Sequence, residues 1–304
     1  MLYHASVTSP HPTSGRPYYG ALFAVVVWGA SFIATKIALH DVQTMTVVWL
    51  RFGIGFLVLA VAVPLRREFF VPNAPDLRSF ALLGFLGITV HQWLQVGGLV
   101  TSLASTTAWI ITAIPLVTAI VARIVLDDPL RRNHIIGILV GAVGVLLVVS
   151  RGDWHRLTEG AFGAPGDLLV GLSTITWSLF SVYSRKALHR HKAAPMTLYV
   201  MGSGWLFTTV IWVMKDGPAD LVKLSAGGWV AIAFLGILCS GFAYIFWYDA
   251  LKALPVAQVS SMLYVEPLVT MFIAAAMLGE PITIAALLGG AVIMLGVKIA
   301  TLTR

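Results

Sequence analysis

Residues 266–281 read EPLVTMFIAAAMLGEP, and residues 114–129 read IPLVTAIVARIVLDDP. Seven of the sixteen positions are identical at an offset of 152 residues. The first position differs in charge, because Glu266 opens one copy and Ile114 opens the other. The pattern indicates an internal repeat whose two copies have diverged at one ionisable position.

The repeat extends beyond these two stretches. Two later glycines of each copy also correspond at an offset of 152, and nearer the N-terminus the offset is 149. That second offset pairs Trp28 with Trp177 and the sequence FLGI at 85–88 with FLGI at 234–237. A longer loop late in the second copy accounts for the change. Two consistent offsets argue against chance similarity between apolar helices.

The composition is that of a membrane protein. Of 304 residues, 58% are hydrophobic and only 11% are charged, whereas a soluble domain has about 25% charged residues. The single cysteine, Cys239, allows no internal disulfide and no cysteine-based metal cluster, and we predict no metal site. The net charge of +7 does not indicate nucleic-acid binding, because the basic residues lie between apolar runs.

The apolar runs predict an all-α integral membrane protein with ten transmembrane helices, since a helix needs about 20 apolar residues to cross a bilayer. We expect a disordered tail over 1–17, a first five-helix repeat over 18–150, a linker over 151–165 and a second repeat over 166–302. The predicted spans are 18–39, 44–65, 79–100, 104–126, 133–150, 166–186, 195–214, 227–250, 255–278 and 283–302.

The basic residues predict the orientation. If the N-terminus is cytoplasmic, fourteen of the 20 Lys and Arg residues lie in or beside cytoplasmic loops, four lie outside and two lie within spans. Basic residues accumulate on the cytoplasmic side of membrane proteins. We therefore expect a multi-pass protein of the plasma (cell inner) membrane with both termini in the cytoplasm.

Five spans per repeat is an odd number, so the second copy enters the membrane from the opposite side. Such inverted-topology repeats build transporters, whose substrate site lies near the middle of the membrane between the two halves. The sequence thus predicts a transporter that works by alternating access.

Five stretches resemble the EamA-type family of the drug/metabolite transporter superfamily: WGASFIATK at 28–36, YDALKALP at 248–255, VEPLVT at 265–270, LGEPIT at 278–283 and GGAVIMLGV at 289–297. The resemblance implies ten helices in two inverted halves and the export of metabolites such as amino acids or drugs. HQWLQ at 91–95 and the tryptophans at mid-membrane resemble the YddG-type aromatic amino-acid exporters. The first copy departs from the family pattern at Ile114.

The third predicted span carries polar residues at mid-depth. His91 and Gln95 are four residues apart and share a helix face with Gln92 nearby. We expect these side chains to face a cavity and bind substrate, with a histidine bonded between helices as the alternative. In the second copy Tyr244 occupies the position of Gln95, so the same face is polar there.

Aromatic residues form the second group of predicted substrate contacts. Trp28 and Trp177 lie at mid-depth, Trp109 lies in the polar stretch STTAWIIT, and Ser181 follows Trp177 by one turn. Aromatic walls suit an apolar side chain or an ammonium group. The alternative is that these rings only fill space between helices.

Charged groups within or beside the spans form the third group, because an ionisable residue in a membrane needs a function or a partner. Glu266 is predicted to carry a proton or to bind a substrate ammonium, or else to be hydrogen-bonded to Ser260, Tyr264 or a neighbouring helix and to fix the kink. Lys252 and Arg51 are candidate anion contacts. The alternatives are an inside-positive anchor for Lys252 and a snorkelling side chain for Arg51.

The predicted function is the export of small organic metabolites, most of all amino acids with large apolar or aromatic side chains. Proton coupling, the exact substrate and the oligomeric state stay open. A multidrug exporter of cationic compounds is the first alternative. An intramembrane enzyme is the second, and it lacks support because the sequence has neither an H-E-x-x-H nor a G-x-S-x-G motif. We expect no cofactor, with the substrate and the lipid bilayer as the only predicted partners.

Overall fold

The computed structural model describes residues 16–127, 129–153, 163–188, 190–215, 217–254, 259 and 262–301, without the side chains of 185 and 186. Within these ranges every regular element is a helix, which agrees with the predicted all-α class. Most residues of the predicted tail 1–17 and of the predicted linker 151–165 lie outside the described residues.

The helices of the first half are α1 (Arg16–Leu39), α2 (Thr44–Leu65), α3 (Ala74–Gly84), η1 (Phe85–Val90), α4 (His91–Leu99), α5 (Ala104–Thr112), α6 (Ile114–Leu126) and α7 (Arg132–Ser150). The helices of the second half are α9 (Pro165–Leu188), α10 (Ala193–Met214), α11 (Gly217–Asp220), η2 (Leu221–Lys223), α12 (Ala226–Ala233), η3 (Phe234–Phe242), α13 (Ala243–Ala253), η4 (Leu263–Val265), α15 (Glu266–Leu278) and α16 (Ile284–Thr301).

The two halves repeat their helix bounds at the offsets found in the sequence. Both ends of α9 and of α10 follow those of α1 and α2 by 149 residues, and both ends of α15 follow those of α6 by 152. In both α6 and α15 the second residue is a proline, and both helices end at a residue of the same backbone conformation. Asp127 has φ 55° and Gly279 has φ 65°, so each stops its helix in the left-handed conformation.

Glycines set the packing of α7 against α16. A Cβ atom on Gly137 would lie 2.5 Å from the carbonyl oxygen of Gly296, and one on Gly144 would lie 2.7 Å from that of Gly289. These positions need glycine, because only a residue without a side chain lets the two backbones approach so closely. Gly137 corresponds to Gly289 and Gly144 to Gly296, so the two contacts are reciprocal. The helices therefore run antiparallel about a local two-fold axis.

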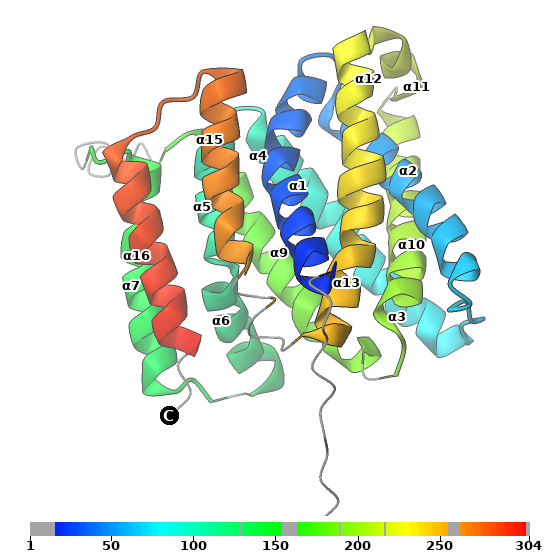
Figure 1. The fold of residues 1–304 in the computed structure, drawn as a ribbon, viewed down its shortest axis with the longest axis horizontal. Coiled ribbons are helices and arrows are strands. Elements are labelled where there is room, and N and C mark those ends of the chain that lie inside the picture. Colours follow the sequence, from blue (N-terminus) through cyan, green and yellow to red (C-terminus); the bar gives the residue numbers. More distant parts are fainter. Residues whose placement is uncertain are drawn as a thin grey trace, which may run out of the picture.

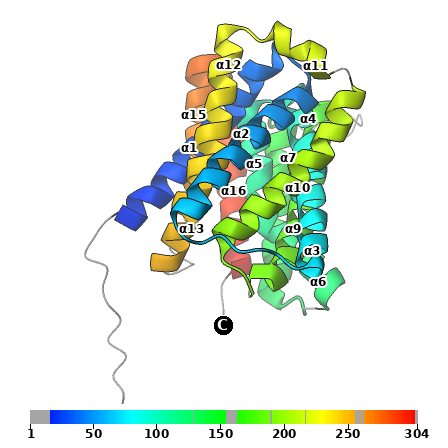
Figure 2. The ribbon, with the colours of Figure 1, turned by 90° about the vertical axis from the view of Figure 1, so that its right-hand side faces the viewer.

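Other contacts follow the same pseudo-symmetry. Repeat-related helices α2 and α10 pack on each other, α1 packs on α13 as α9 packs on α4, and α1 packs on α15 as α9 packs on α6. In Figure 1, α7 and α16 form one edge of the bundle and α2, α3 and α10 form the other. Figure 2 brings α2 and α10 to the front, with α7 and α16 behind. Each half thus contributes helices to the middle of the molecule.

Both halves contain a π-helical segment at the repeated FLGI sequence. The segments η1 and η3 begin at Phe85 and Phe234 and continue without a break into α4 and α13. A Cβ on Gly87 would lie 2.5 Å from the ring of Phe180, and a Cβ on Gly236 would lie 2.5 Å from the Cβ of Ile54. Segments of π-helix are frequent at functional sites, and His91 directly follows η1.

Seven helical segments in the described part of the chain are long and apolar enough to cross a membrane: 16–39, 44–65, 74–99, 132–150, 193–214, 226–253 and 284–301. The predicted span 104–126 is not one straight helix, because α5 and α6 meet at a bend of 43°. If the bent pair α5 and α6 is counted as one span, the described part of the chain has eight candidate membrane spans. The two other predicted spans correspond to α9, which is rich in Ser and Thr, and to α15, which has only 13 residues. The start of the predicted span 255–278 lies partly outside the described residues.

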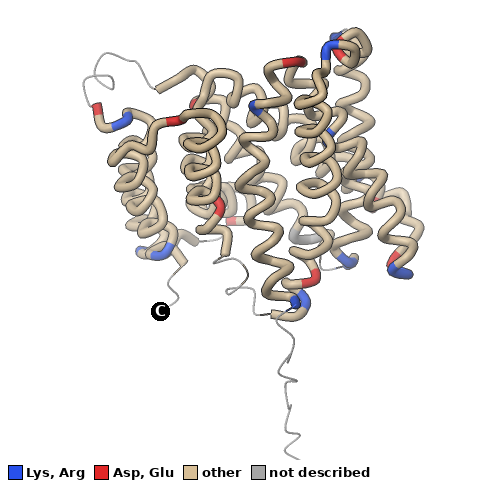
Figure 3. Tube along the Cα trace, turned by 45° about the horizontal axis from the view of Figure 1, so that its top comes forward, with Lys and Arg blue, Asp and Glu red and all other residues tan. Residues whose placement is uncertain are grey.

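Charged residues gather at the two ends of the bundle, and the band between them nearly lacks charge (Figure 3). The helix α1 begins and α16 ends on the same side (Figure 1). We call this side the termini end and the other side the opposite end. This distribution is the one expected for helices whose middle parts lie in lipid.

Candidate functional site

A cavity of about 810 Å³ lies between the two halves. Its lining on α1 includes Trp28 and Phe32, near the middle of that helix, and none of the residues closer to the opposite end. Leu188, Thr197 and Thr301, by contrast, line it at the end of α9, the start of α10 and the end of α16. The cavity therefore extends from mid-bundle toward the termini end.

Most of the residues predicted to form the site meet in this cavity. Those that line it come from α1, α2, α4, α9, α13 and α15, and they are Trp28, Arg51, His91, Gln92, Gln95, Trp177, Tyr244 and Glu266. These residues are up to 238 positions apart in the chain. The sequence placed several of them, such as His91, Trp177 and Glu266, at mid-depth of their predicted spans, and the repeat packing brings the two halves together around them.

His91 joins the two halves. Its Nδ1 atom lies 3.0 Å from the carbonyl oxygen of Ser173 in α9. A carbonyl oxygen only accepts hydrogen bonds, so Nδ1 donates, and the amide nitrogen of Gln95 lies 3.5 Å from Nε2. The His91 ring also lies 4.9 Å from the Trp177 ring. These bonds match the alternative interpretation of His91 as a histidine bonded between helices, at the wall of the cavity.

Gln92 of α4 has a side-chain oxygen without a hydrogen-bond partner in the described part of the chain. Its side chain is buried, with 6% exposure, and none of the described donors reaches its Oε1 atom. A buried amide oxygen without a donor costs about 1–3 kcal/mol. Gln92 lines the cavity, but its Oε1 atom is itself buried, so a bound molecule would reach this atom only after the side chain rotates.

Aromatic rings from both halves form the walls. The Trp28 ring packs against Tyr244 at 5.6 Å and against Trp247 at 5.3 Å, and its Nε1 atom donates to the carbonyl oxygen of Cys239 at 3.0 Å. Trp177, the repeat equivalent of Trp28, packs against Phe180 at 5.0 Å. Trp28 thus contacts η3 and α13 of the second half, and Trp177 contacts His91 of α4 in the first half. The walls suit a large apolar group.

Arg51 is buried in α2, with 7% exposure. Its Nε atom donates to the hydroxyl of Ser240 at 3.0 Å, and its guanidinium carbon lies 5.3 Å from the centre of the Phe52 ring. The predicted alternative of snorkelling is therefore wrong, because the side chain points into the bundle and lines the cavity. Among the described residues that line the cavity, Arg51 is the only lysine or arginine.

Glu266 begins α15 and is followed by Pro267. Its carbonyl oxygen accepts a hydrogen bond from Thr270 at 3.0 Å, and Thr270 also donates to the carbonyl oxygen of Gly29 at 2.8 Å. The carboxylate of Glu266 has no hydrogen-bond partner among the described residues, and Ser260, one of its predicted partners, lies outside them. In that part of the chain Glu266 is also the only acidic residue that lines the cavity.

Three predicted site residues lie outside the cavity. Trp109 is 1% exposed and packs between helices, because a Cβ on Gly290 of α16 would lie 2.5 Å from its ring. Ser181 donates to the carbonyl oxygen of Trp177 at 2.8 Å, within its own helix. Lys252 pairs with Glu68 at 3.2 Å at the termini end. The alternatives of packing and of a terminal anchor describe Trp109 and Lys252 better.

The structure adds residues to the cavity that the sequence reasoning missed. Phe32, Phe180, Trp247 and Tyr248 belong to its aromatic lining. Tyr248 follows Tyr244 by four residues, and this spacing on one helix face is the signal that was available. Phe180 follows Trp177 by three residues, which is the same kind of signal. For Phe32 and Trp247, no sign in the sequence separates a cavity face from a lipid face.

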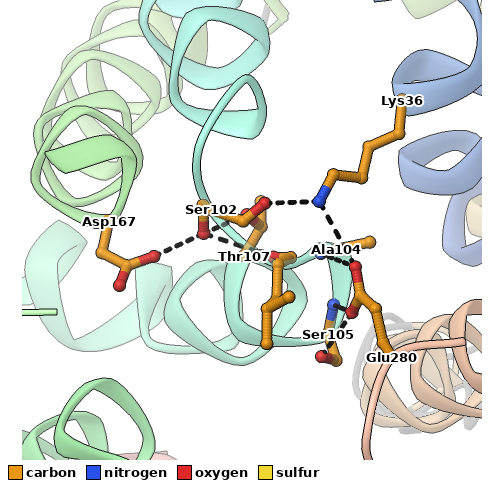
Figure 4. Close-up of polar contacts among 8 residues, drawn as sticks. Lys36, Ser102, Ala104, Ser105, Thr107, Asp167 and Glu280 are labelled. Atoms are coloured by element: carbon orange, nitrogen blue, oxygen red, sulfur yellow. Dashed lines mark hydrogen bonds and ion pairs between the residues drawn. The ribbon is translucent and has the colours of Figure 1, made fainter. Parts of the chain in front are cut away.

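The opposite end is closed by a buried polar cluster around Glu280 (Figure 4). The Glu280 carboxylate accepts hydrogen bonds from the backbone N–H groups of Ala104 at 2.7 Å and Ser105 at 3.0 Å, and from the Ser105 hydroxyl at 2.7 Å. It therefore caps the N-terminus of α5 from the other half of the molecule, where a negative charge is stabilised.

Lys36 of α1 is part of this closure. Its ammonium group donates to the carbonyl oxygen of Ser102 at 2.7 Å and lies 3.4 Å from Glu280 Oε1. The Ser102 hydroxyl donates to Asp167 at the start of α9 and accepts from Thr107 at 3.1 Å. The cluster therefore connects α1, the α4–α5 turn, α9 and the end of α15 (Figure 4).

Comparisons with known proteins agree with this arrangement. The profile of the EamA-like transporter family matches the chain twice, over residues 16–150 and 164–302. A crystal structure superposes with a TM-score of 0.62 at 20% identity, covering 94% of this chain and 96% of the other. At that identity the likeness supports the fold alone.

Three relatives are similar over nearly their whole length. The uncharacterized transporter YyaM of Bacillus subtilis (strain 168) is 28% identical, over 90% of this chain and 89% of its own. A Streptantibioticus cattleyicolor protein named "Probable terminal-alkyne amino-acid exporter" is 26% identical, over 93% of each chain. The uncharacterized inner membrane transporter YedA of Escherichia coli (strain K12) is 24% identical, over 95% of this chain and 92% of its own.

Proposed function

Because the chain belongs to the EamA-like transporter family, we propose that it exports amino acids with large apolar or aromatic side chains from the cytoplasm. It is a multi-pass membrane protein and a transporter, and the proposal concerns its substrate, direction and cycle. One observation carries the choice of substrate. The cavity between the halves combines aromatic walls with the guanidinium of Arg51 and the carboxylate of Glu266, and within the described part of the chain no ion pair joins these two groups.

An amino acid matches this cavity group by group. Its side chain would pack against Trp28, Trp177 and Phe180, and its two charged groups would meet opposite charges at Arg51 and Glu266. The amino-acid exporter named among the relatives and the resemblance to YddG-type exporters support the same class of substrate.

The cycle we propose is alternating access by two inverted five-helix halves with ten membrane crossings. The antiparallel, reciprocal packing of α7 and α16 supports the inversion. In this structure the cavity reaches toward the termini end, and the Glu280 cluster closes the other end. We propose that the termini end faces the cytoplasm, which the distribution of basic residues supports. Substrate would bind here from the cytoplasm and leave once that cluster separates.

A cationic-drug exporter is the second candidate. The volume of about 810 Å³ and the carboxylate of Glu266 would accept a hydrophobic cation. The buried guanidinium of Arg51 favours the amino acid, because it would repel a cation that has no carboxylate of its own.

The test is counterflow in proteoliposomes with labelled amino acids, run with and without a pH gradient. We expect phenylalanine, tryptophan or leucine to accumulate above the level in empty liposomes. Trp177→Ala should lower the rate about tenfold, because an aromatic contact contributes about 1.5 kcal/mol beyond burial. Ser181→Ala, one turn away and outside the cavity, is the matched control and should leave the rate unchanged.

Accumulation of tetraphenylphosphonium with no accumulation of any amino acid would replace the proposal with the cationic-drug alternative. A rate that depends on the pH gradient would identify proton coupling, whereas an unchanged rate would indicate facilitated export.

A further inference from the structure

Arg51 has hydrogen-bonding capacity that the protein does not use. A guanidinium has five N–H donors, and Nε alone is occupied, by the hydroxyl of Ser240. The two terminal nitrogens have no hydrogen-bond or ion-pair partner among the described residues. With 7% exposure, Arg51 is a buried charge inside a membrane protein, and such a charge calls for a counter-charge.

The contacts of Arg51 leave one edge of its guanidinium available to a ligand. The bond from Nε to Ser240 holds one edge, and the Phe52 ring lies 5.3 Å from the guanidinium carbon. The two terminal nitrogens then present parallel donors on the remaining edge. Two parallel N–H donors match the two oxygens of a carboxylate, which arginine binds in a bidentate fashion.

The orientation of Arg51 depends on the other half of the molecule. Ser240 lies in η3, is fully buried with 0% exposure, and occupies the repeat position of His91. Gly55 allows this approach, because a Cβ there would lie 2.6 Å from the Cβ of Ser240. The contact between α2 and η3 thus sets where the guanidinium lies in the cavity.

We propose that the terminal nitrogens of Arg51 bind the carboxylate of the transported molecule and that Ser240 is a positioning residue for this contact. The inference rests on the proposed function and deepens it, because it requires a substrate with a free carboxylate. Glu266, the only acidic residue among the described lining residues, is then left for the ammonium group. An amine or an alcohol of the same shape would leave Arg51 unpaired and would bind weakly.

The test compares molecules that differ in one group, on the full-length chain in detergent. The binding probes are L-phenylalanine, phenethylamine, which lacks the carboxylate, 3-phenylpropionate, which lacks the amine, and inorganic phosphate as a general anion. In the unmodified chain phenylalanine should bind at least tenfold more tightly than phenethylamine, because a charge-assisted pair is formed only with the former. Phosphate should not compete with phenylalanine.

The variants test the roles of the two residues. Arg51→Gln should weaken phenylalanine binding to the level of phenethylamine and leave phenethylamine binding no weaker than before. Ser240→Ala should reduce the preference for phenylalanine severalfold, and Ser240→Thr, which keeps the hydroxyl, should restore part of it. Arg51→Lys keeps the positive charge but lacks the two parallel N–H donors, so its affinity for phenylalanine should lie between those of the unmodified chain and Arg51→Gln. It serves as the second variant if Arg51→Gln does not fold. A single size-exclusion peak and an unchanged melting temperature are the criteria for folding.

Equal weakening of phenylalanine and phenethylamine in a folded Arg51 variant would overturn the assignment of Arg51 while leaving amino-acid export intact. Binding of 3-phenylpropionate that depends on Arg51, without binding of any amino acid, would overturn the proposed function and keep the carboxylate site. Competition by phosphate would show a general anion site and would also overturn the inference.

Discussion

The two ends of the molecule handle charge in different ways. At the opposite end, Glu280 and Asp167 are buried, with exposures of 8% and 7%, and hydrogen bonds from other segments satisfy them. At the termini end, the side chains of Arg66 and Asp249 pair at 2.5 Å but are 33% and 38% exposed. The cavity extends toward the second of these ends. The Glu280 cluster, where the bundle is closed, is thus buried and saturated, whereas the Arg66–Asp249 pair, on the side that the cavity approaches, is partly exposed.

This difference suggests that the Glu280 cluster, and not the ion pairs at the termini end, holds the present conformation. A buried hydrogen bond to a charged group contributes about 1.5–3 kcal/mol, and an exposed ion pair contributes about 0–1 kcal/mol. The three predictions that follow rank substitutions at the two ends by these magnitudes.

The largest effect is expected for Glu280→Gln. Removing the charge weakens the cap on α5 and the pair with Lys36, at a cost of about 1.5 kcal/mol. In a Cys239→Ser background with Thr112→Cys in the cavity, an impermeant maleimide added from the opposite end should label about tenfold faster. Labelling is measured in membrane vesicles that expose that end.

Glu68→Gln is the matched control for this prediction. Glu68 pairs with Lys252 at 3.2 Å and with Lys192 at 3.8 Å at the termini end. Its replacement should leave labelling from the opposite end within twofold of the unmodified value. Equal acceleration by both variants would show that the Glu280 cluster has no special role in the closure.

A smaller effect, dependent on pH, is expected for Asp220→Asn. Asp220 also lies at the opposite end, 1% exposed, and accepts from Thr46 at 2.8 Å, Lys223 at 2.8 Å and the Gln43 N–H at 3.1 Å. Burial raises the pKa of Asp220, but the hydrogen bonds and the charge of Lys223 outweigh it, and the pKa lies below its ordinary value of 3.8.

A lowered pKa in the folded state stabilises the fold above the ordinary pKa, and this contribution is lost as the pH falls through the folded value. Asp220→Asn should therefore lower the melting temperature by a few degrees at pH 7, for a loss of about 1 kcal/mol. The difference in melting temperature between the unmodified chain and Asp220→Asn should narrow once the pH falls below 3.8. A gap that is the same at pH 7 and pH 3 would show that the carboxylate charge is not the cause.

The smallest effect is expected for Arg66→Gln at the termini end. The pair with Asp249 is partly exposed, so its loss should change the melting temperature by less than about 2 °C. High salt should remove even this difference, because screening weakens exposed pairs. A drop as large as that of Asp220→Asn would contradict the contrast drawn between the ends.

Helix positions were largely predictable. The spans predicted for 44–65 and 133–150 agree with α2 and α7 to within one residue. The repeat offsets read from the sequence reappear in the helix bounds. Hydrophobic runs locate helices well, because a bilayer requires every backbone polar group to be satisfied within the helix.

The break at Ala113 was not predicted. The apolar run 104–126 continues through it, and Pro115 was the only local signal for the bend of 43° between α5 and α6. A proline near a helix start is tolerated without a bend, so the sequence alone left both geometries possible.

The direction of each side chain was predictable only in part. Trp109 and Trp177 both lie in polar-flanked stretches, yet Trp177 lines the cavity and Trp109 packs against α16. In a soluble helix the hydrophobic stripe shows which face is buried. Here lipid and protein interior are both apolar, so the pattern does not separate the two faces.

The amino-acid sequence by itself determined that this chain is a helical membrane protein built from two related halves, and it predicted the depth of His91, Trp177 and Glu266 along their spans. Each residue advances a helix by about 1.5 Å, so depth follows from position along a span. The tertiary structure alone decided which residues meet. Arg51 faces Ser240 and Lys36 faces Glu280, because these contacts arise from the rotation and antiparallel packing of helices far apart in the chain.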